Sequence, residues 1–167
     1  MLKHLFFICL LSTSLWQCSN SSDDACRYGK PKPIFSDEMA GVVSHSFLQE
    51  GQEGNEQIRL QSGLEVEIYQ TGCDAIKQEF RFTLQDLPPT QPDAFWISAA
   101  AACFIELSTL EADPIIFSQY AQAIQQYAPN FILGEQAELA TGFYMMIDGI
   151  KMGGEGLLRV VFQSTKE

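Results

Sequence analysis

The segments Leu64–Gln70 (LEVEIYQ) and Ile76–Leu84 (IKQEFRFTL) carry the clearest structural pattern in this chain of 167 residues. In each segment, one set of alternate positions is largely apolar and the other is largely charged or polar. Successive side chains of a β-strand point to opposite faces, so this period of two predicts strands with one buried and one exposed face. Ile58–Gln61 lies just upstream, across a turn signal at Ser62-Gly63. Short turns between these segments predict an antiparallel meander.

Val42–Gln49 also has a strand pattern and adds a fourth strand at the start of the meander. The acidic segment Gln49–Glu56 (QEGQEGNE) is broken by glycines, and we expect a solvated turn there. Its carboxylates Glu50, Glu53 and Glu56 are spaced more widely than the oxygen ligands of a calcium loop. The segment therefore predicts no cation site.

Two helices are expected after Leu87-Pro88-Pro89, which ends the meander. The first begins near Gln91, where Thr90 and Asp93 resemble a capping box. Its apolar stripe at helical spacing consists of Trp96, Ala99, Ala100, Cys103, Leu107 and Leu110. We expect this stripe to pack against the sheet, so that Trp96 and Cys103 are buried.

The second helix begins at Asp113-Pro114, because proline is favoured at the first helical position, and it stops at Ala128-Pro129-Asn130. Its apolar face consists of Ile116, Phe117, Tyr120, Ile124 and Tyr127. The tyrosines of this face fit either a ligand site or, more simply, an aromatic face packed into the core.

Leu139–Ile147 and Leu157–Ser164 predict two more strands, with a turn at Asp148-Gly149 and a flexible glycine loop over residues 153–156. The pattern as a whole predicts an α+β fold of order ββββααββ. About six mostly antiparallel strands would form one twisted sheet, with two helices packed on one face. Residues 34–167 form this single domain.

The N-terminal 18 residues have the order of a secretory signal, with basic residues, an apolar run over Leu5–Leu11 and then small polar residues. Leu15-Trp16-Gln17-Cys18 resembles the lipobox of bacterial lipoproteins, although Gln17 stands where that box usually has a small residue. The resemblance implies a signal peptide over residues 1–17, a lipid on Cys18 and a polar tether over residues 18–33. It places the protein in the bacterial cell envelope, facing the periplasm or the cell surface. The alternative is plain secretion after cleavage at Ser14.

The charge is one-sided, with 21 acidic against 10 basic residues and a formal net charge of −11. Such a surface repels phosphate backbones and anionic headgroups, so the sequence predicts no nucleic-acid partner and no membrane contact besides the lipid. It favours cationic protein partners, or it serves solubility alone.

Cys9 leaves with the signal peptide and Cys18 is assigned to the lipid, so three cysteines remain. Cys26 lies in the tether and Cys73 in a turn between two strands, and we favour a disulfide between them. Cys103 then stays unpaired in the apolar stripe of the first helix. Three cysteines allow the other pairings as well.

The sequence predicts no catalytic, metal or cofactor site. His45 is the one histidine left after the signal peptide, and a nucleophile pair would need the mid-helix thiol of Cys103, a position that does not lower a thiol pKa. A candidate apolar contact surface near the last hairpin consists of Tyr144, Met145, Met146, Ile150 and Met152.

Three functions remain after these exclusions. The first is a non-catalytic domain that binds another envelope component. The second is a carrier of a small apolar ligand between sheet and helices, which requires a cavity there. The third is an acidic inhibitor or sequestering protein for a cationic extracellular protein.

Overall fold

The computed structural model describes residues 28–72, 75–110 and 114–164. The described residues form seven strands, two α-helices and a short 3-10 turn. In chain order these are β1 (Val42–Glu50), β2 (Glu53–Leu60), β3 (Glu65–Thr71), β4 (Lys77–Leu84), α1 (Asp93–Leu107), α2 (Pro114–Tyr127), η2 (Ala128–Asn130), β5 (Gln136–Ala140), β6 (Phe143–Met152) and β7 (Glu155–Gln163). Within these residues, neither helix is long and apolar enough to cross a membrane.

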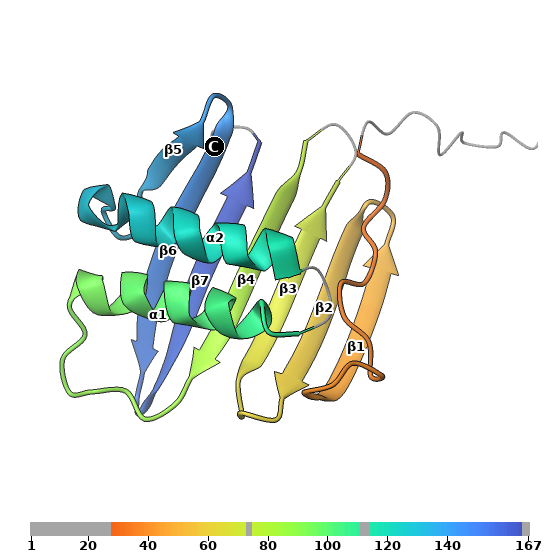
Figure 1. Ribbon diagram of the computed structural model, residues 1–167, viewed down its shortest axis with the longest axis horizontal. Coiled ribbons are helices and arrows are strands. Elements are labelled where there is room, and N and C mark those ends of the chain that lie inside the picture. Colours follow the sequence, from red (N-terminus) through yellow and green to blue (C-terminus); the bar gives the residue numbers. More distant parts are fainter. Residues whose placement is uncertain (1–27, 73–74, 111–113, 165–167) are drawn as a thin grey trace, which may run out of the picture.

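The strands form one antiparallel sheet in the order β1-β2-β3-β4-β7-β6-β5. Two meanders, β1–β4 and β5–β7, meet where β4 pairs with β7. Both helices lie side by side across the same face of the sheet (Figure 1). The predicted α+β class and the two helices on one face are therefore confirmed.

The face of the sheet that the helices cover carries the apolar positions of the sequence pattern. Ile68 of β3 pairs with Phe80 of β4, which pairs with Val160 of β7, and all three side chains are buried. Aromatic rings from the helices fill the space above them, and the centroid of Phe104 lies 5.0 Å from that of Phe80. Trp96 and Cys103 are both buried, as the layered arrangement requires.

The strand count and order differ from the prediction, because the fold has seven strands in the order ββββααβββ. The single strand expected over Leu139–Ile147 is divided by a turn at Thr141-Gly142 into β5 and β6. The turn expected at Asp148-Gly149 is wrong, because both residues lie inside β6 and the chain turns at Gly153-Gly154 instead.

The indole ring of Trp96 on α1 packs directly against the backbone of Gly149 in β6. A Cβ atom at Gly149 would overlap the indole ring of Trp96, and one at Gly156 of β7 would lie 3.0 Å from the same ring. The two glycines, on the adjacent strands β6 and β7, thus form a slot for Trp96. A glycine in a strand often marks such a close approach.

The capping box predicted at Thr90 is wrong as well. Helix α1 begins at Asp93, and the residue before it is Pro92 in an extended conformation with no side-chain cap. Proline lacks an N–H and has a fixed φ, so its backbone sets the start of the helix here without a capping side chain.

Candidate ligand-binding site

Residues 28–35, which we call the strap, lie against the sheet beside the helices. They run along β1 and β2 on the helix side (orange in Figure 1). Pro31 is buried, and a Cβ atom at Gly54 of β2 would lie 2.7 Å from its side chain. The ring of Phe35 stacks on Phe117 of α2 with centroids 5.6 Å apart. Residues 28–33, predicted as part of the tether, thus include residues packed on the sheet.

A buried glutamate holds the strap to the sheet. Glu56 of β2 is completely buried, and its carboxylate accepts the backbone N–H of Ile34 at 2.9 Å and that of Phe35 at 2.8 Å. The same group lies 2.9 Å from His45 Nε2 on β1. The expectation of a solvated turn at Glu56 is wrong, because donors from the strap replace the water that a buried carboxylate would lose.

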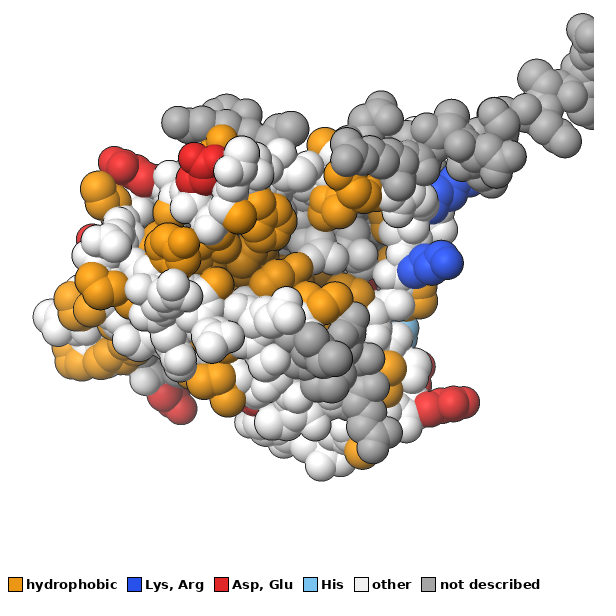
Figure 2. Space-filling model, turned by 45° about the horizontal axis from the view of Figure 1, so that its top comes forward, with side chains coloured by type: hydrophobic (Ala, Val, Ile, Leu, Met, Phe, Trp, Pro, Cys, Tyr) orange, Lys and Arg blue, Asp and Glu red, His pale blue; other side chains and the backbone are white. Residues whose placement is uncertain are grey.

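A cavity of about 600 Å³ lies between the strap, the ends of β3 and β4 and the start of α2. It opens where the covering layer changes from the helices to the strap, so neither fills the space above the sheet. Figure 2 shows hydrophobic side chains around a hollow in this face of the molecule. The apolar walls are formed by Ile34, Ile76, Phe80, Ile116, Phe117 and Tyr120. We call this space the strap cavity.

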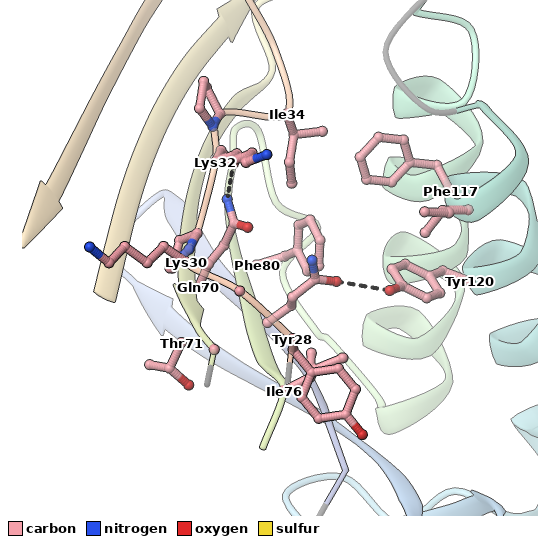
Figure 3. Close-up of a pocket in the computed structure, with 16 residues that line it drawn as sticks. Tyr28, Lys30, Lys32, Ile34, Gln70, Thr71, Ile76, Phe80, Phe117 and Tyr120 are labelled. Carbon is pink, nitrogen blue, oxygen red and sulfur yellow. Dashed lines mark hydrogen bonds between the residues drawn. The ribbon is translucent and has the colours of Figure 1, made fainter. Parts of the chain in front are cut away.

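Two glutamines place a polar strip on the floor of the strap cavity. Gln70 of β3 pairs with Gln78 of β4, and both occupy register positions on the covered face. Gln70 Nε2 donates to the carbonyl oxygen of Lys32 at 3.1 Å, and the Tyr120 hydroxyl donates to Gln78 Oε1 at 2.8 Å (Figure 3). The strip offers neutral hydrogen-bonding groups in an otherwise apolar space.

The lining of the strap cavity has an unusual charge for this chain. Lys30 and Lys32 of the strap belong to it, and no Asp or Glu does among the lining residues that the structure describes. The strap cavity is thus basic at its rim, although acidic residues outnumber basic ones about two to one in the sequence.

The sequence contains one signal for this site, which lies in the strand pattern itself. In both β3 and β4 the apolar alternation reaches a glutamine at the position where another hydrophobe is expected, at Gln70 and Gln78. A polar residue on the buried face of a strand needs a partner or a cavity. The helical pattern placed Tyr120 either in a ligand site or in the core, and it belongs to both. It lines the strap cavity, and its ring stacks on that of Phe162 with centroids 3.9 Å apart.

The opposite face of the sheet carries paired charges. Glu79 of β4 accepts from Arg81 Nε at 2.7 Å and from Arg159 Nη2 at 2.9 Å, and Arg81 also lies over the ring of Tyr69. Burial opposes ionisation of Glu79, but the hydrogen bonds from Arg159 and Arg81 outweigh it and lower the pKa of this carboxyl below its ordinary value. These contacts link β3, β4 and β7, and the two arginines balance the negative charge of Glu79.

The residues of the predicted apolar contact surface divide between the two faces of β6. Met145 is fully buried under the helices, so it belongs to the core. Tyr144 and Met146 are half-buried on the opposite face, and Ile150 and Met152 are more than half exposed near the end of the last hairpin. None of these five residues lines the strap cavity.

His45 and Cys103 have surroundings that differ from those of a nucleophile pair. His45 contacts Glu56, while Cys103 is a buried free thiol on α1. Burial, and then the charge of Glu106, raise the pKa of Cys103 to about 12. Within the described ranges, no group of three His, Cys, Asp or Glu could hold a metal ion. The predicted lipid site Cys18 and the predicted disulfide of Cys26 with Cys73 lie outside the described residues.

Comparisons with protein-family models, with curated proteins and with solved structures find no match to this chain.

Proposed function

We propose that this chain is a lipid-anchored binding protein of the bacterial cell envelope, and that it takes a small, largely apolar ligand into the strap cavity. The observation that carries the proposal is the cavity itself, about 600 Å³ in volume and walled by aromatic and aliphatic side chains. Small-molecule sites are typically cavities of roughly 300–1,000 Å³ with mostly apolar walls and a few placed polar groups. The amides of Gln70 and Gln78 are such groups.

A carrier fits this arrangement better than an enzyme does. The polar groups that line the cavity are amides, hydroxyls and lysines, and the closest hydrogen bonds join them to one another. General acid–base chemistry most often uses an imidazole, or a carboxyl group, placed beside the ligand. Glu56 and His45 lie outside the described lining, where Glu56 accepts from the strap and His45 contacts Glu56.

The test is binding of a fluorescent apolar probe, 1-aminoanthracene, to the purified full chain. We expect one probe molecule per chain in a titration. Ile116→Trp should fill part of the cavity and weaken binding at least fivefold, because Ile116 lines it. Ile132→Trp is the matched control, since Ile132 is exposed and lies outside the lining. No saturable binding, or equal binding by the two variants with both folded by thermal unfolding, would remove the proposal.

The lipid anchor is tested separately. Intact-mass analysis of the membrane fraction should show a chain that begins at Cys18 and carries acyl groups. Cys18→Ser should move the protein from the membrane fraction to the soluble exported fraction. A soluble parent chain that begins at Leu15 would instead support plain secretion.

A further inference from the structure

We infer that the ligand of the strap cavity is an amphipathic anion, with an apolar body inside the cavity and a carboxylate or phosphate at the strap. This inference rests on the proposed function and narrows its ligand class.

The body of the ligand must be apolar because the described residues inside the cavity offer it no charged group. The walls toward α2 are Ile116 and Phe117, and the opposite wall is formed by Phe80 of β4 and by Ile76 just before that strand. The polar groups on the floor are neutral amides, and a charged group placed among them would lose its hydration without a counter-charge. An ionised group of the ligand therefore belongs at the rim.

The rim selects the sign of that group. Both charged side chains in the lining are lysines of the strap, Lys30 and Lys32. In Figure 3, Lys32 lies beside Ile34 and Gln70 at the cavity, whereas the end of the Lys30 side chain extends away from it. A flexible lysine at the rim attracts an anion and repels a cation, and the described lining offers no carboxylate to reverse this. We assign the head group to Lys32.

The volume limits the size of the body. At about 30 Å³ for each water-sized group, a cavity of about 600 Å³ accommodates at most about 20 such groups. A medium-length acyl chain or a fused aromatic carboxylate fits within this limit, and a two-chain phospholipid does not.

The experiment compares three probes with the same ten-carbon chain, namely decanoate, decanol and decylamine, each displacing 1-aminoanthracene from the full chain. We expect decanoate to bind about fivefold more tightly than decanol, near the upper limit for a solvent-exposed ion pair, and decylamine to bind most weakly. The advantage of decanoate over decanol should shrink between low and high salt, because ions screen exposed charges.

Variants assign the effect to the strap. Lys32→Gln should remove the preference for decanoate and leave decanol affinity within twofold, and Lys32→Glu should reverse the order of decanoate and decylamine. Lys151→Gln is the matched control, because Lys151 is an exposed lysine outside the lining. Decylphosphate in place of decanoate shows which anionic head group is preferred.

The outcomes separate the two proposals. If 1-aminoanthracene itself shows no saturable binding, the proposed function fails. If it binds but none of the three decyl probes displaces it, the carrier function stands and the inference of an amphipathic anion is overturned. If decanol or decylamine binds as tightly as decanoate, or if Lys32→Gln changes nothing, the carrier function stands and the inference of an anionic ligand is overturned.

Discussion

Replacing Glu56 should release the strap and destabilise the whole domain. The backbone N–H groups of Ile34 and Phe35 both donate to its carboxylate, and His45 Nε2 contacts it as well. A buried donor left without an acceptor costs about 1–3 kcal/mol. Glu56→Ala leaves two of them without an acceptor, so we expect a loss of about 2–6 kcal/mol, a large part of the roughly 5–15 kcal/mol typical of a domain.

Two readouts check this expectation. A loss of about 3 kcal/mol lowers the melting temperature by roughly 6–12 °C in a domain of this size. Hydrogen exchange should also accelerate at the amides of Ile34 and Phe35, because a locally held segment opens before the core does. Glu56→Gln keeps one acceptor oxygen and should lose only about 1 kcal/mol.

The control is Glu53→Ala on the same strand, because Glu53 is exposed. An exposed substitution of this kind should change stability by less than about 0.5 kcal/mol. The reasoning is refuted if Glu56→Ala is as stable as Glu53→Ala and exchange at the two strap amides is unchanged.

Three further predictions concern the core and the paired charges. Gly149→Ala should cost about 1–3 kcal/mol in urea unfolding, because the added methyl overlaps Trp96, whereas Gly154→Ala, with open space around it, should be nearly neutral. The pKa of Glu79 is lowered in the folded chain, so its stabilisation is present above the ordinary carboxyl value of 4.5 and is lost as pH falls below it. The difference in urea midpoint between the parent and Glu79→Gln should therefore narrow from pH 7 to pH 3, and a constant difference would contradict it. Cys103, buried with its pKa raised to about 12, should resist iodoacetamide at pH 8 until urea unfolds the chain. Rapid labelling of Cys103 itself in the native protein would be the contrary result.

The sequence predicted the parts of the fold that depend on local periodicity. The alternation in Glu65–Thr71 and Lys77–Leu84 marks both strands and their buried faces, because each position depends only on its neighbours along the strand. The two helices follow from their apolar spacing in the same way. Pro114 lies at the first position of α2, as its fixed φ predicts.

The errors concern residues whose surroundings come from distant parts of the chain. Glu56 looks like a loop residue, and it is buried because donors 21 and 22 residues upstream meet it. Asp148-Gly149 looks like a turn, and Gly149 lies in a strand because Trp96 of α1 needs the slot. No local pattern contains either partner.

The candidate site combines both cases. Gln70 and Gln78 are detectable as polar residues in an apolar alternation, and the helical spacing places Tyr120 on the apolar face of α2. The strap could not be anticipated, since residues 28–33 have the composition of a tether. Its packing depends on Gly54, which makes room for Pro31.

The position of β7 has a consequence for how the protein is made. Of the strands in the described residues β7 is the last in the chain, yet it lies inside the sheet, between β4 and β6, and joins the two meanders. A ribosome therefore finishes the two outer parts before the strand that unites them, and until then β4 presents an open edge with an apolar face. A nascent chain stopped before Glu155 would leave that edge unpaired, so we expect such fragments to need a chaperone or to aggregate.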